Sequence, residues 1–402
     1  MDSEVSVKQH STEMDSEVSV KQHSTEMDSE VSVMLHCAPA QGLKEHQIQV
    51  EISNRFNRRS VPEIEMHIEA VWNERVTKEP WLFNGAKFRL HSAELYTPSQ
   101  TSPFLCTEAQ ETTSHPLGSG EGDDQLGNHS GPNHITLHCS EGEKCTCLTE
   151  THTSSDKENS SCCHQASGEP QKDARPSEAN GVILRLQLGL TCYKDFLGTN
   201  WSHEAVNLQQ RGHLELGDPQ ALLAQPLGVG AVLLTSDGHV VMLRRSQRVA
   251  EAAGLLDIPG GHPEPKAVCQ GMSEHDISVD LMQGYERAVV AEIFSSVCAE
   301  VRDEVNVPLD FLSAPVLMGI ALNHTSAGRP SAEFFMRCSL TTEEVKDFYW
   351  RGGPEAHEST DIVFLSQSEM LSLDVKVPLW LELCPSSKGA VLLYQLVRPD
   401  QS

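Results

Sequence analysis

Hydrophobic and polar residues alternate along several short segments of the chain, as they do in strands that bury one face. The segments Gln47 to Ile52 and Phe88 to Leu95 show this alternation, and it returns at Val182 to Leu190. Because successive side chains of a strand point to opposite faces of a sheet, each segment is predicted to be a half-buried strand. We expect the last two to pair with each other as the arms of one very long hairpin.

A second group of predicted strands lies in the C-terminal half. Val229 to Leu234 and His239 to Leu243 flank Ser236-Asp237-Gly238, a turn sequence that favours a hairpin. Apolar runs of strand length follow at Val316 to Leu322, Glu333 to Leu340 and Asp361 to Leu365.

Between the strands, apolar residues recur at helical spacing. In Pro62 to Val76 they predict a helix with Pro62 in its first turn. Gly217-Asp218-Pro219-Gln220 resembles a helix start, because Asp is a good cap and Pro is tolerated in the first turn. The other predicted helices are Leu281 to Val305, Thr342 to Trp350 and Gly389 to Val397. Alternating strands and helices with hairpins indicate an α/β fold in which helices cover both faces of a mixed sheet.

Two regions differ in composition from this pattern. The segment from Met1 to Glu13 recurs as Met14 to Glu26 and starts again at Met27, so residues 1–26 are predicted to be a disordered tandem repeat. Residues 97–179 contain few large apolar side chains and are predicted to be a disordered insert, because they cannot bury enough surface to offset the entropy of ordering. We therefore predict an N-terminal α/β domain over 27–211, interrupted by the insert, and a second domain over 212–402.

The chain is strongly acidic, with a formal net charge of −27 over 402 residues. This charge argues against nucleic acid and anionic membranes as partners, because both require a basic surface. The sequence shows no signal peptide and no apolar run of transmembrane length, and its 12 cysteines are scattered. We expect an intracellular protein, cytoplasmic or nuclear, with reduced cysteines.

Three carboxylates in the predicted helix that ends at Val305 are the strongest chemical signal. Glu300, Asp303 and Glu304 stand at positions i, i+3 and i+4, so a helix places them on one side. Oxygen ligands of this kind suit Mg²⁺ or Mn²⁺ together with substrate phosphates. Gly260-Gly261 upstream lets the backbone pass close to a phosphate or a metal. The pattern predicts a site for a metal ion and a diphosphate.

The line Ala299-Glu300-Val301-Arg302-Asp303-Glu304-Val305-Asn306-Val307 resembles the signature helix of the Nudix hydrolases. The outer glutamates of the family's metal triplet match Glu300 and Glu304, and Asp303 replaces the middle one. The usual Arg is Ala299 and the final Gly is Asn306, which tolerates the left-handed conformation that ends a helix. A long insert separates Gly261 from the helix, so that Glu292 is the nearest match to the usual upstream Glu.

Longer strings resemble one branch of this family, the UDP-glucose diphosphatases, from about Met27 to the C-terminus apart from the insert. The segments that carry the resemblance are Pro80 to Phe83, Lys87 to His91, Tyr193 to Trp201, Leu255 to Pro265 and Gly352 to Thr360.

The resemblance implies a Nudix α/β/α sandwich and a Mg²⁺-dependent hydrolysis of UDP-glucose or UDP-galactose to UMP and a sugar 1-phosphate, with Mn²⁺ as an alternative metal. Glu300 and Glu304 would be the catalytic metal ligands, with Asp303 in support. The implied substrate contacts are Phe83 and Tyr193 for the uracil base and Arg245, Ala250, Asp257, His262 and Glu264 elsewhere on the substrate.

Several alternatives stay open at the level of sequence. The general base is unassigned, and the loop from Gly352 to Thr360 offers Glu355, His357 and Glu358. The same fold could act on another diphosphate, such as ADP-ribose or a CoA derivative. A catalytically silent nucleotide-binding domain is the rival from a different class. Neither the preferred sugar nor the oligomeric state follows from the sequence.

Overall fold

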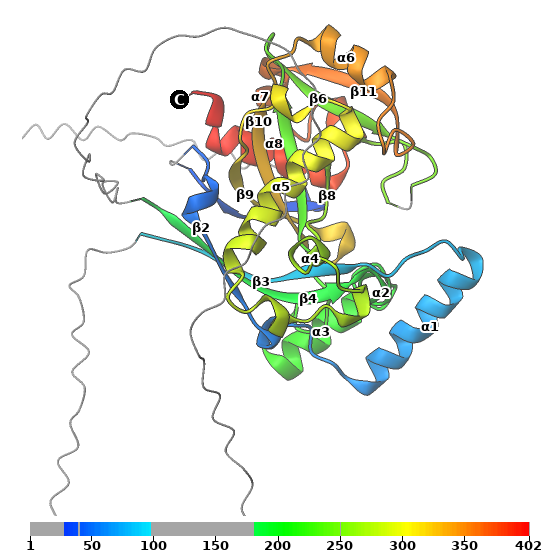
Figure 1. Ribbon diagram of the computed structural model, residues 1–402. Coiled ribbons are helices and arrows are strands. Elements are labelled where there is room, and N and C mark those ends of the chain that lie inside the picture. Colours follow the sequence, from blue (N-terminus) through cyan, green and yellow to red (C-terminus); the bar gives the residue numbers. More distant parts are fainter. Residues whose placement is uncertain (1–27, 39–40, 98–180, 250, 402) are drawn as a thin grey trace, which may run out of the picture. The chain divides into compact units, whose positions relative to one another are not determined.

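A computed structural model describes residues 28–38, 41–97, 181–249 and 251–401 of the chain (Figure 1). The predicted tandem repeat at 1–26 and nearly all of the predicted insert at 97–179 lie outside the described residues, and their disorder stays a prediction. Ala250, an implied substrate contact, also lies outside them.

The larger of two sheets has eight strands, and its main path runs in the order β1-β9-β10-β5-β6-β11. Strands β10 and β5 are parallel, whereas the other neighbours in this path are antiparallel, so the sheet is mixed as predicted. Short strands β7 and β8 pair with β6 and β5. The bounds are β1 Val31–His36, β5 Gly228–Leu234, β6 His239–Arg245, β7 Leu256–Asp257, β8 Gly260–Gly261, β9 Val316–Asn323, β10 Arg329–Arg337 and β11 Ser359–Ser366.

Helices cover both faces of this sheet, with α5 (Glu286–Val305) in front and α8 (Pro385–Val397) behind in the view of Figure 1. The apolar side of α5 packs on alternate residues of β5 and β10, and α8 packs on the residues between them. The shorter helices are α4 (Pro265–Val268), α6 (Thr342–Trp350) and α7 (Gln367–Ser372). The predicted α/β/α sandwich is confirmed.

The smaller sheet has the order β2-β4-β3, with β2 at Ile48–Ile52, β3 at Ala86–Tyr96 and β4 at Ile183–Cys192. Strands β3 and β4 are antiparallel, and Phe88 lies opposite Leu190, which confirms the predicted pairing of these segments. Helices α1 (Pro62–Lys78), α2 (Tyr193–Gly198) and α3 (Ala205–Leu216) accompany this sheet. The division into two domains at residue 212 stays a prediction; strand β1, from the N-terminal part, joins the larger sheet.

Local expectations near helix ends had different outcomes. Asn306 ends α5 with φ 62°, as predicted for a residue that tolerates the left-handed region. The helix begins at Glu286 rather than at Leu281, and Gly284 lies between them with φ 82°. The expectation of a helix start at Gly217 is wrong: Gly217 has φ 70° and terminates α3, and Asp218 accepts a hydrogen bond from the amide of Gln220 in a turn.

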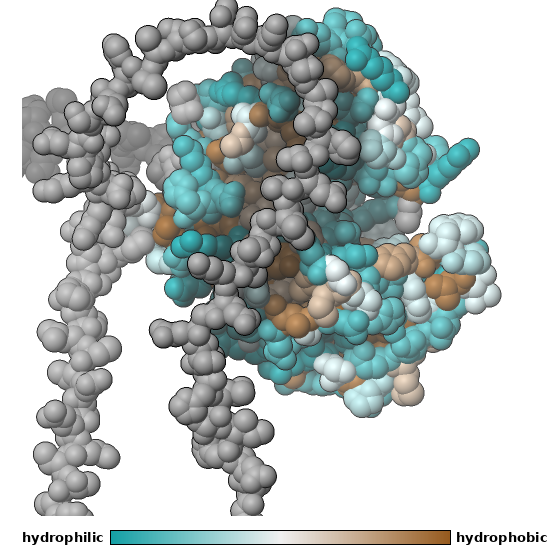
Figure 2. All heavy atoms as spheres, viewed as in Figure 1, coloured by the Kyte–Doolittle hydropathy of each residue, from teal (hydrophilic) through white to brown (hydrophobic). Residues whose placement is uncertain are grey.

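The described part of the chain contains no helix that is long and apolar enough to cross a membrane. All six cysteines in it carry free thiols. Figure 2 shows that the visible face of these residues is mostly hydrophilic, in keeping with the acidic composition.

Candidate active site

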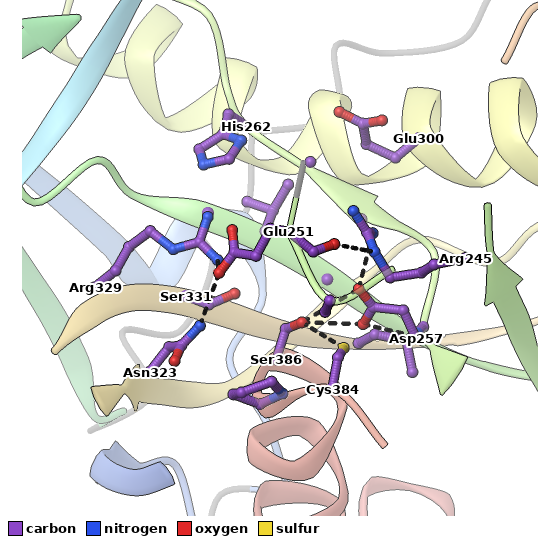
Figure 3. A pocket seen from close by; sticks show the side chains of 18 of the residues that line it. Arg245, Glu251, Asp257, His262, Glu300, Asn323, Arg329, Ser331, Cys384 and Ser386 are labelled. Carbon is purple, nitrogen blue, oxygen red and sulfur yellow. Dashed lines mark hydrogen bonds and ion pairs between the residues drawn. The ribbon is translucent and has the colours of Figure 1, made fainter. Parts of the chain in front are cut away.

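A polar cavity of about 320 Å³ lies where several strands of the larger sheet meet the middle of α5 and the start of α8 (Figure 3). Glu300 of α5 faces it from one side and Ser386 of α8 from the other. Arg245 and Asp257, from the ends of β6 and β7, also line it, together with the glycines of β8. The cavity therefore brings together residues from five separate parts of the sequence.

Glu304 lies beneath the cavity and is only 8% exposed. One of its carboxylate oxygens accepts a hydrogen bond of 2.8 Å from the backbone amide of Gly260. Burial raises the pKa of Glu304 well above its usual value, and the nearby charge of Glu300 raises it further. This carboxylate therefore ties α5 to the diglycine turn, and its negative charge is poorly compensated.

Glu300 lies one turn before Glu304 and lines the cavity. Burial raises its pKa to about 7, with further contributions from the carboxylates of Glu355 and Glu358. A Cβ atom at Gly261 would collide with the Glu300 carboxylate. Glycine is therefore required at position 261 because this carboxylate packs directly against the turn.

Asp303, the third acidic residue of the predicted cluster, is placed differently. Its carboxylate pairs with Arg302 at 2.5 Å and does not line the cavity. Its backbone carbonyl accepts a hydrogen bond of 3.2 Å from the amide of Glu355. Asp303 thus contacts the site through its backbone, by holding the loop that carries Glu355.

The loop 352–358 closes one side of the cavity with the side chains of Glu355 and Glu358. A Cβ atom at Gly353 would lie 2.6 Å from the carbonyl oxygen of Asp303, so the loop packs tightly on the end of α5. The carbonyl of Glu358 accepts a hydrogen bond of 2.7 Å from Ser246, which follows β6. His357 is exposed and does not line the cavity. Of the three base candidates, two therefore face the cavity.

Arg245 and Asp257 form an ion pair of 3.1 Å at the edge of the sheet. Asp257 also accepts a hydrogen bond of 3.0 Å from the hydroxyl of Ser386, near the first turn of α8. The Nε of Arg245 donates to the carbonyl of Glu251 at 3.1 Å. These contacts fix the guanidinium group with part of its edge facing the cavity.

His262 and Glu264 follow the diglycine turn, and both line the cavity. Burial lowers the pKa of His262 well below its usual value, and the cations Arg329 and Lys87 lower it further, so the imidazole is neutral. Glu264 pairs with Lys87 at 3.1 Å, which connects this turn to β3 of the smaller sheet.

An aromatic cavity of about 220 Å³ adjoins the polar one. Tyr193, Phe196 and Trp201 line it, and their rings stack in sequence with centroid distances of 6.3 Å and 6.1 Å. The residues that line both cavities are Lys87, Arg245, Glu251, His262 and Arg329. Phe83, the second implied base contact, is 62% exposed and lines neither cavity.

Sequence reasoning missed several residues of the site, including Lys87, Glu251, Arg329 and Ser386. Each is an isolated polar residue in its own segment, and no spacing rule connects them. Lys87 lies in a segment that carried the family resemblance, which was the only available signal. Their roles become visible only because the fold brings the ends of β6, β10 and α8 to one place.

Comparison with known proteins assigns the class. No family model matches the chain. "Nudix hydrolase 9" of Arabidopsis thaliana is 32% identical over 230 residues, which cover 56% of this chain and 69% of that protein. "Uridine diphosphate glucose pyrophosphatase NUDT22" is 42% identical in the mouse, Mus musculus, over 365 residues that cover 90% of both chains. The human, Homo sapiens, protein of the same name is also 42% identical, over 90% of this chain and 92% of its own.

The chain therefore belongs to the Nudix hydrolase family, in the group of proteins that includes these NUDT22 diphosphatases. It is a hydrolase that acts on diphosphates, and enzymes of this family use a divalent metal ion.

The residues present fit such an ion by their chemistry. Among the described residues, no three His, Cys, Asp or Glu side chains stand as a ready-made coordination group. However, Glu300 lines the cavity with Glu355 and Glu358, and their mutual repulsion raises the pKa of Glu300. A divalent cation would relieve this repulsion, and oxygen donors are the ligands that Mg²⁺ and Mn²⁺ prefer.

Proposed function

We propose that the chain hydrolyses UDP-glucose and UDP-galactose to UMP and the corresponding sugar 1-phosphate, with Mg²⁺ as the cofactor. The name of the 42% identical relatives, which align over 90% of the chain, supports this substrate class. The observation that carries the proposal is the pair of adjoining cavities, one aromatic and one acidic, which share five lining residues. A nucleoside diphosphate sugar has the matching order of a flat base, a charged diphosphate and a polar sugar.

In this account the chain positions the substrate rather than reacting with it. The oxygen of a water molecule forms a bond to one phosphorus while the bridging P–O bond on that phosphorus breaks. The released phosphate keeps the bridging oxygen, and one proton of the water is lost to solvent or to a base. Phosphoryl transfer needs mainly alignment and charge stabilisation, so it makes few covalent demands on the protein.

Glu300 and Glu304 would hold the metal ion, with Asp303 in support from the same helix. When bound, Mg²⁺ neutralises charge on the diphosphate and lowers the pKa of a bound water. Arg245 contacts the diphosphate, and Glu355 and Glu358 are the base candidates because both face the cavity. Ala250, Asp257, His262 and Glu264 remain proposed substrate contacts around it.

Tyr193 and Phe83 are the proposed contacts of the uracil base. Tyr193 already lines the aromatic cavity, whereas Phe83 would have to move from its exposed position to reach a base there. Stacking on an aromatic side chain contributes about 1–3 kcal/mol per base. We also propose an intracellular location, which the free thiols of the described residues support.

The test is release of UMP from UDP-glucose by the purified protein, with Mg²⁺ and with EDTA. We expect UMP and glucose 1-phosphate in equal amounts with Mg²⁺, and neither product with EDTA. UDP-galactose, ADP-ribose and a CoA derivative form the substrate panel. Turnover of ADP-ribose or CoA without turnover of either UDP-sugar would overturn the substrate assignment, and no turnover at all would favour a silent binding domain.

A further inference from the structure

Arg329 occupies the boundary between the aromatic and the polar cavity. It is the first residue of β10 and follows the turn 324–328, and its side chain is 15% exposed. Its guanidinium carbon lies 5.5 Å from the centroid of the Phe196 ring, in the aromatic cavity. Its Nη2 donates to Glu251 at 3.2 Å on the polar side (Figure 3). Arg329 therefore contacts both halves of the site.

We propose that Arg329 binds the phosphate attached to the nucleoside, and that Glu251 is the partner which this phosphate replaces. The inference rests on the proposed function, because it assigns one part of the nucleotide to one residue of the same site. It makes Arg329 the residue that distinguishes a nucleotide from a nucleoside.

The geometry points to this phosphate rather than to the one on the sugar. Phe196, under the guanidinium, lines the aromatic cavity with Tyr193, where the base is proposed to bind. Glu300 lines only the polar cavity. A ligand that runs from Tyr193 to Glu300 therefore passes Arg329 first, at the position where its first phosphate follows the ribose.

The guanidinium group is already arranged for an anion. Arginine presents a planar fork of donors that matches phosphate geometry, and stacking on an aromatic ring fixes the plane of the fork. One oxygen of Glu251 takes a hydrogen bond from Arg329 and another, also of 3.2 Å, from the side-chain amide of Asn323. The carboxylate thus occupies a position lined by donors, as a stand-in for a second anion.

The two members of this ion pair should then have opposite effects on nucleotide binding. Loss of Arg329 removes a charged contact with the phosphate. Loss of the charge on Glu251 removes both a competitor for the guanidinium group and a source of like-charge repulsion. A purely structural ion pair would behave differently, because removal of either member would disturb the site in the same direction.

The experiment measures binding of UMP and of uridine by calorimetry, in wild type, Arg329→Gln, Arg329→Lys and Glu251→Gln. We expect Arg329→Gln to raise the Kd for UMP about 10- to 100-fold, as for loss of one charge-assisted contact, and to leave the Kd for uridine unchanged. Arg329→Lys should lie between wild type and Arg329→Gln, because it keeps the charge but loses the fork. Glu251→Gln should lower the Kd for UMP roughly two- to tenfold.

Arg337→Gln is the matched control. Arg337 ends the same strand and also lies over an aromatic ring, with 5.4 Å from its guanidinium carbon to the centroid of Phe335. It is exposed and lines neither cavity, so the affinity for UMP should not change.

Steady-state kinetics with UDP-glucose provide a second readout. Arg329→Gln should raise KM by a similar factor while kcat falls less than about threefold, as expected for binding that is equal in ground and transition states. An unchanged Kd for UMP in Arg329→Gln, or an equal loss of uridine and UMP binding, overturns the inference. If wild type hydrolyses no UDP-sugar, the proposed function fails, and the UMP and uridine measurements still decide the role of Arg329.

Discussion

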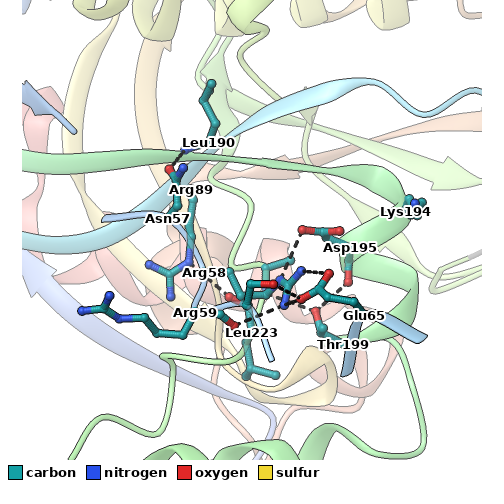
Figure 4. A network of polar contacts seen from close by, with 12 residues as sticks. Asn57, Arg58, Arg59, Glu65, Arg89, Leu190, Lys194, Asp195, Thr199 and Leu223 are labelled. Carbon is teal, nitrogen blue, oxygen red and sulfur yellow. Dashed lines mark hydrogen bonds and ion pairs between the residues drawn. The ribbon is translucent and has the colours of Figure 1, made fainter. Parts of the chain in front are cut away.

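The smaller sheet and the active site both bury charged side chains, but they treat those charges in opposite ways. Beside the smaller sheet, the guanidinium of Arg89 is 1% exposed and donates to the backbone carbonyls of Phe56, Gln220 and Leu223 at 2.7–3.1 Å (Figure 4). Arg58 nearby forms a two-pronged pair with Glu65 at 2.8 Å and 2.9 Å. Every buried cation there has partners that satisfy it.

In the active site the buried charges are carboxylates, and the cations of the cavity are already engaged elsewhere. Lys87 pairs with Glu264, and Arg245 and Arg329 pair with Asp257 and Glu251. Glu300 and Glu304 are left facing each other, and burial together with repulsion raises the pKa of both.

The contrast shows how to separate structural from functional burial of charge. A satisfied buried charge, such as that of Arg58, stabilises the fold or is neutral to it. Buried charges of one sign without partners oppose folding unless a ligand of the opposite sign binds. The acidic side of the cavity has this second character, which is why we assign it to a divalent cation.

The largest effect is expected from Glu304→Gln, which keeps the size of the side chain and removes its charge. We expect kcat for UDP-glucose to fall by about 10³-fold, the upper end for loss of one electrostatic group. The melting temperature should stay equal or rise, because the charged form is disfavoured by burial. Asp303→Asn, at a position that does not line the cavity, should lose at most about tenfold. Activity like wild type in Glu304→Gln would refute the metal assignment.

On the structural side of the comparison, Arg89→Leu should destabilise the fold. It leaves three backbone carbonyls without their donor, and each such loss costs about 1–3 kcal/mol. We expect the free energy of unfolding to fall by at least about 3 kcal/mol in urea denaturation. The folded fraction should keep its turnover per molecule. Arg185→Leu on β4, where the side chain is exposed, is the control and should change stability little. Equal stability of the two variants would contradict the structural role.

A smaller loss of activity is expected from Gly261→Ala. The added methyl group would displace the Glu300 carboxylate from its position against the turn. We expect kcat to fall about 10- to 100-fold, as when the support of a metal ligand is lost. In Gly85→Ala the new Cβ would meet nothing nearer than 3.5 Å, so this variant controls for an added methyl group. Comparable kinetics in both variants would show that Glu300 does not depend on the glycine.

The smallest effect concerns Glu333, a third buried carboxyl, in the centre of β10. It is 0% exposed, neither oxygen has a hydrogen-bond partner among the described residues, and burial raises its pKa to about 8. Between its unfolded pKa of about 4.3 and 8, the folded state binds more protons than the unfolded state. Stability should therefore fall as pH rises through this window, by at most about 1.4 kcal/mol per pH unit.

Glu333→Gln removes this titration while other groups titrate in both proteins. The stability of wild type relative to this variant should thus decline from pH 5 to pH 8, as measured by urea denaturation at each pH. Parallel stability curves for the two proteins would contradict the raised pKa.

Periodicity predicted the parts of the molecule that depend on local patterns. The pairing of β3 with β4, the mixed sheet and the end of α5 at Asn306 follow from alternation, helical spacing and one residue that tolerates positive φ. The failure at Gly217 has a local cause, because an Asp that accepts a hydrogen bond two residues ahead occurs in turns as well as in helix caps.

The candidate site was predictable only where its residues cluster in sequence. Glu300 and Glu304 stand one turn apart on α5, and the diglycine turn against them has a composition that signals close packing. Arg329 and Glu251 are far apart in the chain, and nothing near either residue indicates the other. Their pairing depends on the meeting of β10 with the loop after β6, which is a property of the fold.

The most direct test of the central claim is Mn²⁺ binding, followed by the loss of the free-ion signal in electron paramagnetic resonance. Mn²⁺ prefers the same oxygen ligands as Mg²⁺ and can be displaced by it. We predict that wild type binds Mn²⁺ in competition with Mg²⁺, and that Glu304→Gln weakens this binding at least about tenfold. Equal Mn²⁺ affinity in the two proteins would contradict the claim that the uncompensated carboxylates of α5 hold the metal.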